Sequence, residues 1–146
     1  MIRDKIYVKH VSYSNYIGGA SIAAHNIHCA IKKNVKSEFI CINNYSKKTK
    51  FNLKAKIRIF IGRLPKLFFL NRLKQSLSFS LLDSPLLKEI NKNKGKFPII
   101  NLHWINRETL SVKDISKINY PLIWTCHDMW PILGAKHIEN GDINFR

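Results

Sequence analysis

The sequence predicts an α/β fold with a Rossmann-like parallel sheet in one domain, 1–146, and two observations lead to this prediction. Residues 5–42 contain a strand, a glycine turn, a helix and a second strand, in that order. Residues 97–126 again contain a strand, a helix and a strand. Such a unit joins parallel strands through a crossover, which is right-handed in nearly all proteins. We therefore expect one doubly wound sheet, interrupted by a basic insert over about 44–96.

The first unit is predicted from residue types and periodicity. Residues 5–11 (Lys-Ile-Tyr-Val-Lys-His-Val) are rich in β-branched and aromatic residues, which favour a strand. After Gly18-Gly19, apolar side chains recur at helical spacing across 20–31. Two lysines and an asparagine at 32–34 suit the C-terminus of that helix. Residues 38–42 (Glu-Phe-Ile-Cys-Ile) are then expected to form a short second strand.

The second unit follows the insert. Residues 97–102 are predicted to form a buried strand, because they are mostly apolar and include two consecutive isoleucines. Residues 109–118 are predicted to be helical, with Ser111 as the N-cap and Asp114 as its partner in an approximate capping box. Residues 121–126 are expected to form a further buried strand of the same sheet.

The insert gives weaker patterns. Residues 51–64 carry apolar side chains at helical spacing among lysines and arginines, which predicts a basic amphipathic helix, although 56–61 also alternate as a strand does. Pro65 is expected to end that helix. Further helices are predicted at 67–82 and at 85–91, the second beginning at its proline.

Composition argues against several classes of protein. Hydrophobic residues make up 45% of the 146 residues, too many for a disordered polar chain. No apolar run approaches the roughly 18 residues of a membrane span, and the charged start is a poor signal peptide, so a cytoplasmic protein is expected. The three cysteines are far apart, which favours reduced thiols in or near the core over disulfides or a zinc site: Cys29, Cys41 and Cys126.

The charge is strongly positive and unevenly distributed. The formal net charge is +16, and 47–96 hold 14 Lys or Arg residues against only Asp83 and Glu89. Such a segment suits nucleic acid, anionic lipid or phosphorylated substrates, although Lys, Asn and Ile are abundant throughout. We predict that cations of 54–74 face an anionic membrane surface, the alternative being a solvated helix face over the core. The cations are Lys54, Lys56, Arg58, Arg63, Lys66, Arg72 and Lys74. Four apolar residues are expected near them: Ile57, Phe60, Phe68 and Phe69.

Polar residues follow several strands of the predicted sheet. His10, His103 and His127 end the first, third and fourth strands, and Asp128 comes directly after His127. Ligands of open α/β sheets bind outside the carboxyl ends of the strands, where helix N-termini also attract anions. A ligand site is therefore expected at this edge, with the loop of Gly18 beside it.

Each of these residues also has a purely structural interpretation. Gly18-Gly19 is compatible with a tight turn, and it is not the GxGxxG of a nicotinamide site. His10 suits an exposed position, and His103 a core position bonded to the backbone. The three histidines match no standard zinc spacing. His127-Asp128 is the most informative pair, because an imidazole beside a carboxylate suits hydroxyl recognition and proton transfer.

Two stretches resemble a known family. Gly18-Gly19-Ala20-Ser21-Ile22-Ala23-Ala24, followed by His28-Cys29-Ala30, is similar to the glycine loop and first helix of family 4 glycosyltransferases. Residues 100–106 and Trp124-Thr125-Cys126-His127-Asp128-Met129-Trp130-Pro131 resemble a subgroup acting in bacterial exopolysaccharide, colanic acid or O-antigen synthesis. The resemblance implies a retaining hexosyltransferase with two Rossmann-like domains, the GT-B fold, of which this chain is the N-terminal, acceptor-side domain.

The resemblance also implies roles for individual residues. Gly18 and Gly19 would lie under the diphosphate of a nucleotide sugar, and His127 would face the transferred sugar. Asp128 would orient His127 or contact acceptor hydroxyls. The acceptor side of the cleft would be lined by His103, Trp104 and Asn106. Such enzymes need no bound metal or other cofactor, because helix dipoles and basic side chains stabilise the leaving diphosphate.

The sequence departs from the subgroup after Pro131, where the chain is expected to be loop-like. The subgroup usually continues Phe-Thr-Gly-Gly-Cys-His-Tyr, whereas 132–138 are Ile-Leu-Gly-Ala-Lys-His-Ile. No segment resembles the donor domain with its paired glutamates. We therefore expect an incomplete domain, inactive alone: a fragment, a remnant, or half of an enzyme whose donor domain is a separate chain.

The expected substrates are a nucleotide sugar and a lipid-linked saccharide acceptor, handled at the inner face of the cell membrane. The alternative is a non-catalytic basic module that binds membrane or nucleic acid. Nucleic acid is the less expected partner, because the sequence shows no helix-turn-helix, zinc-finger or RNA-recognition signature.

Overall fold

The computed structural model describes residues 6–43, 53, 56–62, 82–92, 95 and 97–133. Within them, four parallel strands form one sheet in the order β2-β1-β3-β4. The strands are β1 (Tyr7–Ser12), β2 (Lys36–Cys41), β3 (Pro98–Leu102) and β4 (Leu122–Trp124). This order confirms the predicted parallel α/β sheet. Chain progression reverses between β1 and β3, which is where doubly wound sheets bind their ligands.

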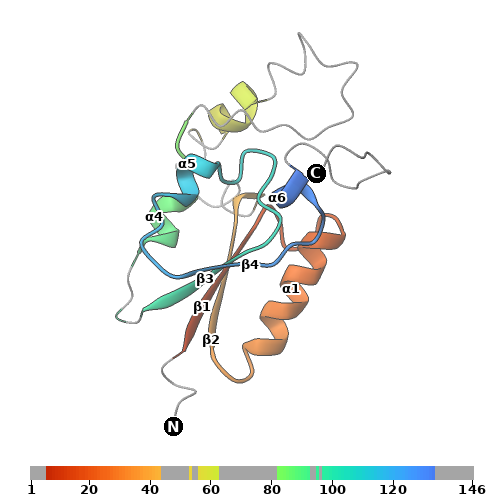
Figure 1. The fold of residues 1–146 in the computed structure, drawn as a ribbon, viewed down its shortest axis with the longest axis vertical. Coiled ribbons are helices and arrows are strands. Elements are labelled where there is room, and N and C mark those ends of the chain that lie inside the picture. The colour runs from red at the N-terminus through yellow and green to blue at the C-terminus, as the bar shows by residue number, and fades with distance from the viewer. Residues whose placement is uncertain are drawn as a thin grey trace.

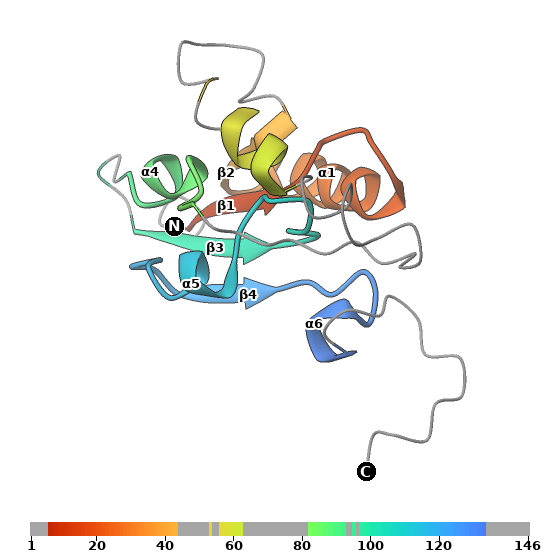
Figure 2. The ribbon, with the colours of Figure 1, turned by 90° about the horizontal axis from the view of Figure 1, so that it is seen from above.

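Helices cover both faces of the sheet. Helix α1 (Gly19–Ile31) packs on one side, whereas α4 (Leu86–Ile90) and α5 (Val112–Ile115) lie on the other (Figure 1). A single turn, α6 (Trp130–Leu133), follows β4 beyond the carboxyl end of the sheet (Figure 2). In the part of the chain that the structure describes, no helix has the length and apolar character needed to cross a bilayer.

Several predicted boundaries need correction. The loop expected after Pro131 begins with the helical turn α6. The helix predicted at 109–118 is only the four-residue α5, although its capping box is present as predicted. The strand predicted as buried at 121–126 is the three-residue β4, in which Leu122 is 42% and Ile123 53% exposed. This difference arises because β4 lies at an edge of the described sheet. Of the three cysteines predicted to lie in or near the core, Cys41 is buried, whereas Cys29 and Cys126 are exposed.

Within the insert, the structure describes only part of what was predicted. Leu53 is helical, and so are residues 56–62, which we call the insert helix; both agree with the amphipathic helix predicted over 51–64. The short helix predicted at 85–91 is present as α4, with Pro85 as its N-cap. The helix predicted at 67–82 lies outside the described residues, apart from its last position.

The two faces of the sheet differ in chemistry. On the α4 and α5 side, apolar side chains form the core, and its buried members are Val11, Ile40, Ile42, Leu86, Ile90, Ile100, Leu102, Ile105 and Leu110. Alternation along β1 turns Lys9 toward this side and His10 toward the opposite side. The Lys9 ammonium donates to the carbonyls of Glu89, Ile90 and Lys92 at 2.8–2.9 Å. A buried cation on β1 therefore binds the carbonyls at the C-terminus of α4 and joins this helix to the sheet.

A second buried cation joins the insert to the main fold. Arg58, only 1% exposed, donates to a carboxylate oxygen of Asp114 at 2.9 Å and to the Glu108 carbonyl at 2.8 Å. The prediction that Arg58 faces a lipid surface is therefore wrong, because buried carboxylate and carbonyl groups hold its guanidinium. Lys56, Ile57 and Phe60 of the same segment are exposed. The other cations predicted to face lipid lie outside the described residues.

Candidate functional site

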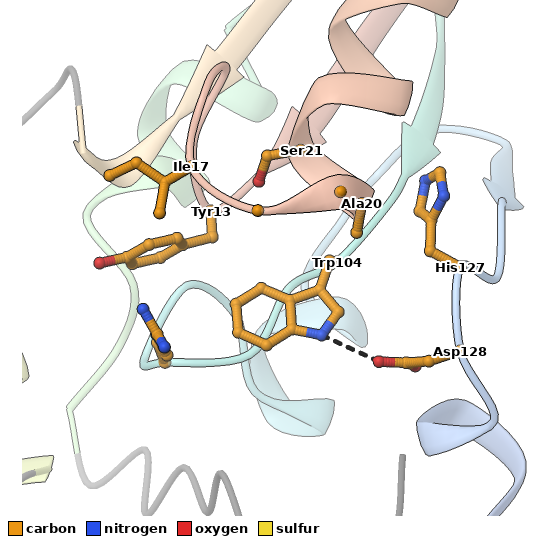
Figure 3. A pocket seen from close by; sticks show the side chains of 10 residues that line it. Tyr13, Ile17, Ala20, Ser21, Trp104, His127 and Asp128 are labelled. Atoms are coloured by element: carbon orange, nitrogen blue, oxygen red, sulfur yellow. Dashed lines mark hydrogen bonds between the residues drawn. The ribbon is translucent and has the colours of Figure 1, made fainter. Parts of the chain in front are cut away.

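Three loops converge beyond the carboxyl ends of β1, β3 and β4. They line a cavity of about 350 Å³, a size suited to a small molecule (Figure 3). Its lining contains Tyr13, Ile17, Gly18, Gly19, Ala20, Ser21, Trp104, Arg107, His127 and Asp128. Five of the seven residues singled out from the sequence therefore meet at one cavity, and His103 and Asn106 are not among its lining residues.

The glycine loop forms one wall of the cavity. Gly18 has φ +83°, in the left-handed region that favours glycine, and α1 begins at Gly19. A Cβ atom built on either glycine meets no other group within 4 Å, so the space above the loop is open. No side chain caps α1, and the first amides of a helix have no partner inside it. Ser21 also lines this wall, and its hydroxyl oxygen is buried without a hydrogen-bond partner.

Trp104 and Asp128 form the opposite part of the cavity. The indole Nε1 of Trp104 donates to a carboxylate oxygen of Asp128 at 3.1 Å (Figure 3). The ring of Trp104 also packs edge-on against Tyr13, with 5.8 Å between the ring centroids. These contacts orient an aromatic surface and a carboxylate toward the same space.

Arg107 is a site residue that the sequence analysis missed. Its guanidinium carbon lies 5.3 Å from the ring centroid of Tyr13 and 5.6 Å from that of Trp104, within cation–π range. Arg107 and Glu108 both have positive φ, 54° and 63°, which is unusual for non-glycine residues. The available signal was its position, one residue beyond the run 100–106 singled out from the sequence.

The three strand-end histidines form a hydrogen-bonded row. The Nδ1 atom of His10 lies 2.9 Å from Nε2 of His103, and Nδ1 of His103 lies 2.9 Å from Nε2 of His127. His10 and His103 are almost completely buried, whereas His127 reaches the cavity. His103 thus lies beneath the cavity and between two other imidazoles. It is not placed to meet an acceptor directly.

Burial keeps this row uncharged near neutral pH. Desolvation, with a smaller effect of His28, lowers the pKa of His10 to about 4. Desolvation, with smaller effects of the neighbouring His10 and His127, lowers the pKa of His103 to about 3. Burial also lowers the pKa of His127, and the charge of Asp128 partly opposes this shift. Such clustered perturbation in a cleft is typical of functional sites.

Asn106 occupies a buried corner of the loop after β3. Its backbone carbonyl accepts from the amide and the hydroxyl of Thr109, at 3.2 and 2.6 Å. Both atoms of its side-chain amide are buried without a hydrogen-bond partner. The predicted contact of Asn106 with an acceptor thus has no counterpart in the lining of the cavity.

The residues around the cavity suit an oxygen-rich anionic ligand. Helix amides and Arg107 favour negative charge, Asp128 accepts from hydroxyls, and Trp104 offers an apolar face.

Among the described residues, no three His, Cys, Asp or Glu side chains are grouped as metal ligands, and the histidines lie in a row. Comparison with protein families, curated proteins and solved structures found no match to this chain.

Proposed function

We propose that this chain is the acceptor-side domain of a GT-B glycosyltransferase that transfers a hexose from a nucleotide sugar to a saccharide acceptor. The observation that carries the proposal is the meeting of Gly18-Gly19, Trp104, His127 and Asp128 at one cavity. Loops after three different strands contribute to it, at the edge where α/β sheets bind ligands. The resemblance of the same segments to family 4 glycosyltransferases supplies the reaction class.

In this proposal, the diphosphate of the donor binds at the start of α1. The free amides of 19–21 and the unpartnered hydroxyl of Ser21 provide donors, and the helix dipole adds a favourable field. Arg107, held over two aromatic rings, adds a full positive charge from the opposite side of the cavity. Together these groups stabilise negative charge without a metal ion.

The sugar occupies the part of the cavity near Trp104. The indole face packs against the apolar side of a pyranose ring, and Asp128, already oriented by the indole N–H, accepts from a sugar hydroxyl. His127 lies between this subsite and the histidine row. A second domain, on the same or another polypeptide, would form the other wall and complete the donor site.

A lipid-linked acceptor would bring the domain to a membrane surface. Exposed Ile57 and Phe60 are three residues apart on one side of the insert helix, while Arg58 holds the opposite side to the core. Leu53, before this helix in the sequence, is also exposed. The basic residues of 47–96 would add attraction to anionic lipid.

The test is a titration of the ¹⁵N-labelled chain with UDP-, GDP- and dTDP-hexoses. We expect the amides of 19–21 and the indole N–H of Trp104 to shift, with dissociation constants in the millimolar range for a single wall, worth about 4 kcal/mol. Arg107→Ala should weaken this binding, whereas Lys56→Ala, exposed on the insert helix, should not. The proposal fails if no nucleotide sugar shifts these signals, or if only nucleic acid or lipid vesicles bind.

A further inference from the structure

We propose that the row His10–His103–His127 fixes the tautomer of His127, so that its Nδ1–H points into the cavity as a hydrogen-bond donor. His103 and His10 are then positioning residues, because they act on a ligand only through His127. The inference rests on the proposed function only for the identity of that ligand as a sugar. The arrangement of protons in the row is independent of it.

The proton count of His103 makes the row directional. A neutral imidazole carries one N–H and one bare nitrogen, and both nitrogens of His103 face another imidazole at 2.9 Å. His103 must therefore donate to one neighbour and accept from the other. Only two arrangements satisfy both bonds: all three rings carry the proton on Nδ1, or all three carry it on Nε2.

The inner end of the row favours protons on Nδ1. In the alternative, His10 would carry its proton on Nε2, an atom that is buried and has no hydrogen-bond partner. A buried N–H without an acceptor is rarer in proteins than an unused acceptor. With the proton on Nδ1, His10 donates to His103, and only a bare nitrogen is left without a partner.

The charges around the row favour the same direction. The titratable groups on the α1 side of His10 are His28 and His25, and Lys32 is close enough to His28 to lower its pKa. At the outer end, the negative charge of Asp128 acts on His127. N–H dipoles directed outward place their positive ends on the side of Asp128, whose carboxylate favours this direction. Arg107 also lines the cavity, where its guanidinium lies over the rings of Tyr13 and Trp104.

A fixed Nδ1–H gives His127 a defined chemical role. Its Nε2 is used by His103, and no described residue bonds to its Nδ1. His127 therefore offers a hydrogen bond to a hydroxyl or phosphoryl oxygen and does not act as a base through this atom. A neutral donor of this kind stabilises negative charge developing on an oxygen, without being protonated itself.

The test is ¹⁵N NMR of histidine side chains in the full chain, because ring nitrogen shifts distinguish the two tautomers and the charged form. At pH 7.5 we expect His10, His103 and His127 all in the Nδ1–H form. His10 and His103 should not titrate between pH 8 and 5. Nε2–H forms, or a mixture of tautomers in any of the three, would overturn the proposal.

A substitution separates the row from the rest of the site. His103→Phe keeps a planar ring of similar size but removes both hydrogen bonds, so His127 should become a mixture of tautomers. His25→Gln, a change on α1 outside the row, should leave His127 as it is. If His103→Phe fails to fold, the measurement on the unchanged chain still decides the proposal. Fixed tautomers without nucleotide-sugar binding would reject the proposed function and leave this inference intact. Mixed tautomers together with nucleotide-sugar binding would reject this inference and leave the proposed function intact.

Discussion

The two faces of this sheet differ in how far their buried polar groups are hydrogen-bonded. On the α4 and α5 side, the buried cations Lys9 and Arg58 are held by carbonyl and carboxylate groups within an apolar core. On the α1 side, buried atoms without a hydrogen-bond partner gather along β1 and α1. These atoms are Nε2 of His10, Oγ of Ser12, Oγ of Ser21 and Nδ1 of His25. Outside β1 and α1, Oδ1 of Asn15 and both polar atoms of the Asn106 amide are also buried without a partner.

The difference separates stability from function. An unpaired buried polar atom costs about 1–3 kcal/mol, so a face that keeps several of them lowers the stability of the fold. Proteins keep such costs mainly where a ligand or a reaction needs the groups. The α1 face leads directly into the cavity through His127 and Ser21. We therefore interpret the α4 and α5 face as the support of the fold and the α1 face as the support of the site.

The largest expected effect is acid sensitivity that originates on the α1 face. The pKa values of His10 and His103 are about 4 and about 3 in the folded chain, against about 6.5 when unfolded. Between pH 6.5 and 4 the unfolded chain binds protons that the folded chain does not, so stability is present above pH 6.5 and lost on acidification. Each histidine adds up to about 1.4 kcal/mol per pH unit, or several kcal/mol in all.

Urea unfolding between pH 7 and 4.5 measures this slope. His103→Phe removes the histidine with the lowest pKa and should make the free energy of unfolding less dependent on pH. An unchanged slope in this variant would show that the histidine row does not cause the acid sensitivity.

The sequence predicted those features that depend on local pattern. The strands at 5–11 and 97–102 and the capping box of Ser111 follow from residue types only a few positions apart. The histidine row could not be predicted, because His10 and His103 are 93 residues apart and meet only when β1 pairs with β3. Residues at strand ends indicated an edge of the sheet, but they did not indicate which side chains touch.

Arg58 shows why composition was a poor guide to burial. Its segment is basic overall, yet its partner Asp114 lies 56 residues away in the capping box of α5. No local pattern connects the two. Arg107 was missed for a different reason, since its left-handed backbone follows from the tertiary position of the loop and not from its residue type.

Arg58→Met should destabilise the α4 and α5 face of the sheet. Arg58→Met removes the cation beside Asp114 and Glu108 and leaves these buried carboxylates without its charge, which typically costs about 3–5 kcal/mol. Lys56→Met, exposed two residues earlier, should change stability by less than about 0.5 kcal/mol. Both are measured by urea unfolding at pH 7.5. Equal effects of the two substitutions would mean that the insert helix is not anchored through Arg58.

The smallest expected effect concerns Arg107. Its guanidinium favours ligand binding, whereas its left-handed backbone would be more stable with glycine. At φ 54°, any side chain with a Cβ atom is strained by about 1–2 kcal/mol, and glycine is not. Arg107→Gly and Arg107→Ala both remove the guanidinium from the cavity, so both should weaken the binding of a nucleotide sugar. Only the glycine variant also relieves the strain. Its free energy of unfolding, measured with urea, should therefore exceed that of the alanine variant by about 1 kcal/mol.

Comparing the two variants with each other cancels the loss of the contacts to Tyr13 and Trp104, which both variants lack. Equal stability would mean that the left-handed backbone of Arg107 costs nothing. Undiminished binding in both variants would remove Arg107 from the site while leaving the strain argument intact.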